Sequence, residues 1–385
     1  MKRIVTLVVS ALLAVGLILT ACYRNRFFDS TVYYGAVQYW FRDGGMVYDW
    51  LKPGTPYGFT YPPFAGLVMA PMSVLPFPVV VLFASIGLVL TVGLLIHWLA
   101  GPFLRGLKYP LWLSYGVAFC LAMAYEPVRE TFSFGQVNTL LLTLVTADLL
   151  FGVARGRWWG GIGIGLATAI KLTPGVFILY LLVTRRWRDA GVAIAAATGA
   201  TVLAGALFPD QSREFWTSAL WDTNRVGSLN FLSNQSERGM LARLPFDETE
   251  SKIWLVCVLA TLVLWGVRCW RAPDDVIGGL ALTGVLGCLI SPVTWIHHCV
   301  WLIPALIRCV EWGWQSGNRR AVWLAVAAYV LMTSHLTWIY ENPPRPPLAM
   351  LGSNIYVLFG VALLIWTPVG TRSSIPVHEP DKILA

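Results

Sequence analysis

Charged residues are scarce in this sequence. Only 12% of its 385 residues are Asp, Glu, Lys or Arg, whereas 57% are hydrophobic. Soluble globular domains carry roughly 25% charged residues. A chain this poor in charge cannot cover a water-facing surface, so a soluble enzyme with an apolar core is excluded and lipid is the expected solvent.

Motifs for metals, disulfides and nucleotides are also missing. The seven cysteines all lie in or at the ends of apolar runs and form no C-x-x-C, which indicates neither a disulfide framework nor a zinc site. No G-x-x-x-x-G-K-[ST] occurs. The net charge is +8, but the basic residues form short clusters between apolar runs, as at 185–188 and 319–320. Such clusters encode membrane topology. We therefore expect no metal, no cofactor and no nucleic-acid partner.

Long apolar runs dominate what is present, together with 19 Trp and 14 Tyr that suit two interfacial belts. The sequence predicts an all-α integral membrane protein, a polytopic bundle of about 11–12 transmembrane helices that forms a single domain over residues 1–385. The runs that could cross a bilayer are 4–22, 79–100, 110–125, 138–154, 158–183, 190–208, 253–270, 276–291, 296–310, 321–339 and 349–367.

The first run, 4–22, has two interpretations. It follows Lys2-Arg3 and ends Leu-Thr-Ala-Cys22, as a lipoprotein signal would. Alternatively it is an uncleaved first transmembrane helix, because it is long enough to span. We favour the helix, since Tyr23 and Arg24 are unlike the small residues that follow a lipidated cysteine.

The positive-inside rule then predicts the orientation. With Lys2 and Arg3 in the cytoplasm, the long polar loops 23–78 and 209–252 lie outside, and both termini, including the tail with Arg372 and Lys382, lie inside. Loops of this length usually carry function. We therefore expect a multi-pass protein with its active site on the extracytoplasmic face.

One run conflicts with this topology. If 158–183 crossed once, the basic cluster at 185–188 would lie outside, and Lys171-Leu-Thr-Pro174 interrupts the run near its middle. Proline breaks a helix and a lysine in lipid is costly. Both problems disappear if the segment is re-entrant, two short helices with Lys171 and Pro174 at the turn, because broken backbone is tolerated where protein buries it.

Few outer residues suit acid–base chemistry. Asp29 follows Phe27-Phe28 and could be a base with a raised pKa, or it could cap a helix over 30–42. Lys171 could bind a phosphate or extend toward the interface. His297 and His298 could bind a phosphate or polarise a leaving group, and two histidines are too few ligands for a metal site.

Two further motifs have structural as well as functional interpretations. Phe59-Thr-Tyr61-Pro-Pro is either a rigid elbow that returns the loop to the membrane or a simple turn. In Gly135-Gln136-Val-Asn138, the two amides could hold sugar hydroxyls, or cap a helix and bond between helices.

Together these motifs resemble glycosyltransferase family 87, polyprenyl-phosphomannose-dependent α-mannosyltransferases of the GT-C superfamily. The resemblance runs in order along nearly the whole chain, through Asp29-x-x-x-Tyr33, Val47-Tyr48, Phe-Thr-Tyr-Pro-Pro at 59–63, Gly-Gln-Val-Asn at 135–138, the small-residue run Gly161–Pro174, Asn234-Gln235-Ser236 with Arg238-Gly239, Ser291-Pro-Val-Thr-Trp295 and His297-His298. Ser30 and Ile296 depart from residues common in the family, and the second leaves open which histidine contacts substrate.

The resemblance implies a GT-C-type bundle in the plasma membrane that transfers mannose from polyprenyl-phosphate-mannose to a lipid or glycan acceptor, as the actinobacterial α-1,2-mannosyltransferases of phosphatidylinositol mannosides and lipomannan do. It implies that Asp29 is the catalytic base of an inverting reaction. Donor phosphate would be bound by His297, His298 and Lys171. The implied sugar- or acceptor-binding residues are Tyr33, Tyr61, Glu126, Gln136, Asn138, Asn234 and Gln235.

Two other classes of function compete with transfer. A transporter or lipid-linked sugar flippase would use a broken helix such as the one at Lys171. However, the sequence has no second Lys-x-x-Pro that would mark paired halves. An inactive structural subunit would leave the ordered polar motifs unexplained.

Overall fold

The computed structural model describes residues 1–222, 225, 227–244, 250–341 and 347–370. Within these residues the chain is helical, and its extended segments meet only in two isolated bridges, Leu51 with Gly58 and Asn234 with Trp295. The all-α architecture expected from the sequence is confirmed. The expected cytoplasmic tail lies outside the described residues.

The helices follow the predicted apolar runs closely. The α-helices are α1 (Lys2–Asn25), α2 (Phe28–Phe41), α3 (Pro63–Met69), α4 (Phe77–Leu95), α5 (Gly101–Gly106), α6 (Leu111–Ala124), α7 (Glu126–Phe134), α8 (Asn138–Ala147), α9 (Ile162–Ile170), α10 (Val176–Val183), α11 (Trp187–Leu207), α12 (Pro209–Glu214), α13 (Glu237–Leu241), α14 (Glu250–Arg271), α15 (Val276–Ile290), α16 (Ile303–Gln315), α17 (Arg319–Thr333), α18 (Pro347–Ser353) and α19 (Ile355–Trp366). Short 3₁₀ or π segments are η1 (Ala70–Ser73), η2 (Ile96–Ala100), η3 (Asp148–Val153), η4 (Thr173–Gly175), η5 (Phe215–Ala219), η7 (Ile296–Leu302) and η8 (Leu336–Tyr340).

Four helices are long and apolar enough to span a membrane: Lys2–Asn25, Phe77–Gly106, Trp187–Leu207 and Glu250–Arg271. The pair α6 and α7 would count as a fifth span, although it bends by 67°. Shorter apolar helices pack among them, for example α15 and α19. These helices confirm a membrane protein. Helix α7 begins anew after the bend, with Pro127 in its first turn, where the missing N–H costs nothing.

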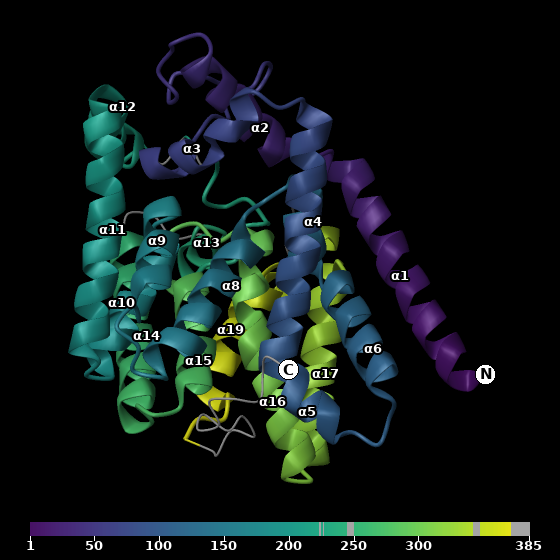
Figure 1. The fold of residues 1–385 in the computed structure, drawn as a ribbon. Coiled ribbons are helices and arrows are strands. Elements are labelled where there is room, and N and C mark those ends of the chain that lie inside the picture. The colour runs from purple at the N-terminus through teal and green to yellow at the C-terminus, as the bar shows by residue number, and fades with distance from the viewer. Residues whose placement is uncertain (223–224, 226, 245–249, 342–346, 371–385) are drawn as a thin grey trace.

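Two apolar cores organise the molecule. One lies within the bundle, and the other lies in a cap, which we define as residues 28–73 with α2, α3 and η1. Figure 1 shows α2 and α3 lying across one end of the bundle, while α1 leans away from its side. Val137 and Ile170 pack against both cores. Val137 and Ile170, which immediately precede Asn138 and Lys171, therefore pack between the cap and the bundle.

The re-entrant hairpin predicted at 158–183 is present. At its start, Gly161 packs so tightly on the backbone of Asp189 in α11 that a Cβ would overlap it. At its end, the Arg186 N–H donates to the Leu181 carbonyl at 2.8 Å. Both ends of the hairpin thus lie beside the start of α11, and α9 and α10 meet at the turn containing Lys171.

Candidate active site

Asp29 lies at the start of the cap, in the first turn of α2. The N-cap position belongs to Phe27 and receives no side-chain hydrogen bond, so Asp29 does not cap the helix. Its carboxylate is partly buried and accepts a hydrogen bond from Gln136 Nε2 at 2.6 Å to Oδ2. Of the two interpretations of Asp29, the structure therefore excludes the cap.

Gln136 is held by a closed set of hydrogen bonds. Its Nε2 also donates to Tyr33 Oη at 2.8 Å, and its Oε1 accepts from Tyr61 Oη at 2.7 Å. The Tyr33 hydroxyl donates to Tyr61 at 3.0 Å. Each of the three polar side chains is both donor and acceptor, which fixes the amide orientation that presents Nε2 to Asp29.

The turn before Gln136 requires glycine. Gly135 has φ +72°, and a Cβ there would overlap Ser30 Oγ, next to Asp29. We expect Gly135→Ala to lower the free energy of unfolding by about 2–4 kcal/mol, because backbone strain and overpacking add. Gly44→Ala is the matched control, since Gly44 has φ +71° but open space around it, and about 1 kcal/mol is expected there. Thermal unfolding in detergent measures both. Equal losses would show that contact with Ser30 is unimportant.

Lys171 extends the network into the bundle. From the hairpin turn, its Nζ donates to Asn138 Oδ1 at 3.0 Å and to Tyr61 Oη at 3.3 Å, and lies 2.9 Å from His298 Nε2. The Trp295 N–H donates to His298 Nδ1 at 3.2 Å and so orients the imidazole toward the lysine. A small cavity opens beside this group, lined among others by Lys171, Asn138 and His298.

The two histidines have different surroundings. The ring of His297 packs against Phe134 with centroids 5.4 Å apart, and its backbone carbonyl accepts from Thr131 and Asn138 side chains. Among the described residues its Nε2 has no hydrogen-bond partner. The sequence left open which histidine contacts substrate, and the structure places His298 against Lys171 and in the cavity wall.

Electrostatics set the pKa of Asp29. Burial raises it from 3.8 to about 6, although the Gln136 hydrogen bond and the charges of Lys171 and Lys52 oppose this shift. A carboxyl group with such a pKa is ionised at neutral pH and still basic enough to accept a proton from a hydroxyl in a transition state.

Lys52 is a nearby cation that the sequence did not single out. It lies in the cap beside the Leu51–Gly58 bridge, with Nζ 3.8 Å from the centre of the Phe28 ring. Phe28 is the neighbour of Asp29 in the sequence, and the Lys52 charge lowers the pKa of that carboxyl. No motif marks Lys52, because its position depends on the loop geometry.

Three predicted substrate-binding residues, Asn234, Gln235 and Glu126, lie outside this network. Asn234 Nδ2 donates to the carbonyls of Leu229 and Pro292, while Gln235 Nε2 donates to those of Leu232 and Ser353. Both amides are buried and hold loops together. Backbone carbonyls occupy their donor groups, which gives both amides a structural role, and their contact with sugar stays a prediction.

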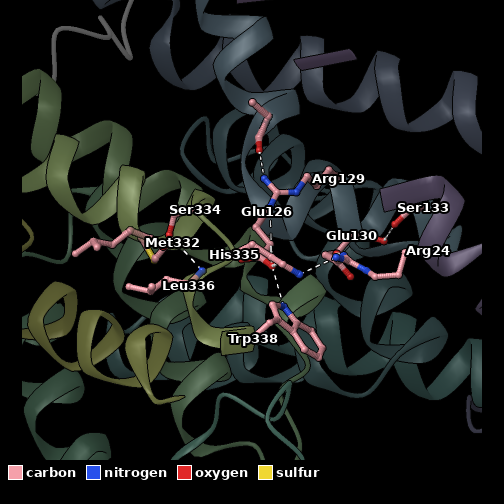
Figure 2. Close-up of polar contacts among 12 residues, drawn as sticks. Arg24, Glu126, Arg129, Glu130, Ser133, Met332, Ser334, His335, Leu336 and Trp338 are labelled. Carbon is pink, nitrogen blue, oxygen red and sulfur yellow. Dashed lines mark hydrogen bonds and ion pairs between the residues drawn. The ribbon is translucent and has the colours of Figure 1, made fainter. Parts of the chain in front are cut away.

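Glu126 belongs to a separate cluster, shown in Figure 2. Its carboxylate is 1% exposed and accepts from Tyr356 Oη at 2.7 Å, from Trp338 Nε1 at 3.0 Å and from His335. These three protein donors give Glu126 a structural role, and its contact with sugar stays a prediction. Glu126, Glu130 and His335 could in principle hold a metal, but Arg24 donates to Glu130 and His335, so its guanidinium already supplies the positive charge.

Comparison with known proteins identifies the family. A profile for glycosyltransferase family 87 matches residues 59–292, from the Phe-Thr-Tyr-Pro-Pro elbow to Pro292. The chain belongs to glycosyltransferase family 87. It is therefore a membrane-embedded glycosyltransferase, as the motif order predicted.

Curated relatives extend the match beyond that region. The chain is 35% identical over 376 residues to a Mycolicibacterium smegmatis polyprenol-phosphate-mannose-dependent α-(1-2)-phosphatidylinositol pentamannoside mannosyltransferase, covering 90% of this chain and 86% of the relative. A Mycobacterium tuberculosis α-(1-2)-phosphatidylinositol mannoside mannosyltransferase with the same donor dependence is 35% identical, covering 71% and 67%. An α-(1->3)-arabinofuranosyltransferase of M. tuberculosis is 34% identical, covering 84% and 74%. No solved structure matches the chain.

Proposed function

We propose that this family 87 enzyme transfers mannose from polyprenyl-phosphate-mannose to a lipid or glycan acceptor and forms an α-1,2 linkage with inversion. One observation carries the proposal. A continuous hydrogen-bonded series runs from the carboxylate of Asp29 through Gln136 and Tyr61 to Lys171 and His298. A base therefore lies at one end of the site and phosphate-binding groups lie at the other, as direct displacement at an anomeric carbon requires.

At the cap end, Asp29 acts on the acceptor. Its carboxylate takes the proton of the acceptor hydroxyl while that oxygen attacks the anomeric carbon of the donor mannose. The bond between that carbon and the donor phosphate oxygen breaks as the new glycosidic bond forms. The electron pair of the broken bond leaves with polyprenyl phosphate. Because the acceptor attacks the side opposite to the leaving group, a β-linked donor gives an α-linked product. No covalent enzyme intermediate is needed.

At the bundle end, Lys171 and His298 bind the departing phosphate. The leaving group gains a negative charge, and fixed donors aimed at that charge lower the barrier because they need no rearrangement. Asn138 holds Lys171 through its Oδ1 atom. His297 stays a candidate for a second phosphate contact, since its Nε2 has no partner among the described residues.

Between the two ends, Gln136, Tyr33 and Tyr61 would hold sugar hydroxyls. The two tyrosine hydroxyls bond to Gln136, which bonds to Asp29, and the hydrogen bonds among the three side chains can be exchanged for contacts with sugar hydroxyls. The donor tail would lie between helices of the bundle, which explains why the catalytic unit is embedded in lipid. No step requires a metal.

The orientation rests on charge. We propose that both termini are cytoplasmic and that the cap faces outward, according to the positive-inside rule. The re-entrant hairpin supports this assignment, because it returns the Arg185, Arg186 and Arg188 cluster to the same end of the bundle as Arg155 and Arg157, where Arg188 donates to the Gly156 carbonyl at 3.4 Å.

The test is incubation of purified protein with polyprenyl-phosphate-mannose and phosphatidylinositol mannosides, followed by mass analysis and linkage analysis of the products. We expect addition of one hexose through a 1,2 linkage. A parallel reaction with polyprenyl-phosphate-arabinofuranose addresses the arabinofuranosyltransferase relatives, and pentose addition alone would reject mannose. Uptake of the donor into vesicles without product would favour the flippase alternative.

The pH dependence of transfer reports on Asp29. Because the pKa of Asp29 in the substrate-free enzyme is about 6, we expect kcat/KM to fall below pH 6, by about tenfold per pH unit once the carboxyl is protonated. The folded state binds this proton more tightly than the unfolded chain, so Asp29 destabilises the fold as pH rises from 3.8 to about 6. Initial rates at subsaturating donor and acceptor between pH 5 and pH 8 measure the effect on kcat/KM. A flat profile would contradict the base assignment.

A further inference from the structure

The backbone before Asp29 makes an unusual bend. Helix α1 ends at Asn25, and the next two residues, Arg26 and Phe27, have φ +48° and φ +54°. Neither is glycine, so the left-handed conformation of each residue is strained. Helix α2 then starts at Phe28, one residue before Asp29. The position of the proposed base is therefore set by a strained bend that other contacts must stabilise.

Residues at the end of α7 hold both sides of that bend. The Phe27 N–H donates to the Ser133 carbonyl at 2.8 Å, and Ser30 Oγ donates to the Gly135 carbonyl at 3.2 Å. The next residue, Gln136, bonds to the Asp29 carboxylate. Residues 133–136 therefore both hold the bend and contact Asp29, which follows the bend.

Glu130 ties this stretch to α1. Its Oε1 accepts from Arg24 Nη2 and its Oε2 accepts from Asn25 Nδ2 at 3.0 Å, so both oxygens bind the last two residues of α1. Asn25 also donates to Ser133 Oγ at 2.8 Å. Figure 2 shows Arg24, Glu130 and Ser133 side by side. Glu130 is 2% exposed, whereas the Arg24 side chain that it binds is 41% exposed.

We infer that Glu130 is a positioning residue for Asp29, an inference that rests on the proposed function. Glu130 anchors the last turn of α1 on α7, and the bend then holds the carboxylate against Gln136. Helix α1 also packs on α6 and on the rest of α7, but only 11% of its apolar stretch is buried in the protein, so the polar contacts of Glu130 fix its last turn. Without the anchor, α1 could shift in the lipid and carry the bend with it.

The first test is the kinetics of Glu130→Ala, with kcat expressed per donor-binding site so that misfolded protein does not count. We expect kcat to fall about 10²-fold, as misplacement of a reacting group by about 1 Å does. The KM for the donor should change less than about threefold, because Lys171 and His298 bind its phosphate from other elements. Glu130→Gln, which keeps an oxygen for Asn25, should lose less.

The pH profile separates positioning from plain destabilisation. Burial is the main reason that the pKa of Asp29 is raised, so an Asp29 released from Gln136 and exposed to water should titrate at lower pH. We expect the acid limb of kcat/KM to move to lower pH in Glu130→Ala. An unchanged limb, or an unchanged kcat, would overturn the inference, since loss of folded protein alone cannot move a limb.

A third measurement does not depend on activity. Amide hydrogen exchange at Phe27 should accelerate in Glu130→Ala, because its N–H is held by Ser133 at the bend. Glu311→Gln is the matched control: Glu311 is also buried but lies in α16, away from the bend. Amide exchange at Phe27 in the Glu311→Gln variant should equal that in the wild type. If wild-type protein transferred no mannose, the proposed function would fail, while unchanged exchange in Glu130→Ala would reject the anchor separately.

Discussion

Asp29→Asn is expected to lower kcat by about 10³-fold while leaving donor binding within about threefold of wild type. The amide is nearly isosteric and can still meet Gln136, but it cannot take a proton from the acceptor. Single-turnover reactions with purified protein measure the rate constant of the chemical step, which limits kcat in this variant. Equilibrium binding of the donor measures its affinity before the reaction. The loss therefore belongs to the chemical step.

The control for this variant is Asp43→Asn. Asp43 lies in the same cap but is exposed, and no ion pair to it occurs within 4.0 Å among the described residues. It should keep wild-type kcat. Retained transfer by purified Asp29→Asn protein would reject Asp29 as the base, and equal losses in both variants would indicate a general effect of charge in the cap.

Lys171→Met is expected to lower kcat/KM for the donor by about 10²–10³-fold. Methionine fills similar volume but brings no charge and no hydrogen bond to the phosphate. Part of the loss should be in donor affinity, because the phosphate is already anionic before transfer, and part in kcat, because its charge grows in the transition state. The two components are separated by donor titration under single-turnover conditions.

Lys252→Met serves as the comparison. Lys252 is exposed near the start of α14, so its loss should leave both constants unchanged. A Lys171→Met enzyme with wild-type kcat/KM would show that the hairpin turn takes no part in phosphate binding. His298→Ala would then be the remaining test of that end of the site.

Several parts of the structure could be predicted because their causes are local in sequence. The hairpin is predicted from Lys171 and Pro174, which are costly in a helix that faces lipid. It is also predicted from the basic cluster at 185–188, which the positive-inside rule assigns to the cytoplasmic side. The motif order brought Asp29, Gln136 and Lys171 together as candidates. The structure places all three in one hydrogen-bonded series.

The sequence could not show the partners of side chains that bond to distant residues. Glu126 bonds to Trp338 and Tyr356, and Gln235 bonds to Ser353, more than 100 residues away in each case. A carboxylate or amide serves a sugar hydroxyl and a protein donor equally well, so composition could not separate these roles. The choice between His297 and His298 depended on η7, in which the two ring planes differ by 87°.

The hairpin also has a consequence for biogenesis. Its arms, α9 and α10, have 9 and 8 residues, far below the roughly 20 that a helix needs to cross a bilayer alone. Gly161 at the start of α9 and Gly165 within it pack against α11, which is synthesised after them. We therefore expect the hairpin to adopt its final position only after α11 has been inserted. The active site is then completed by the packing of inserted helices against one another, and not by the insertion of each helix in turn.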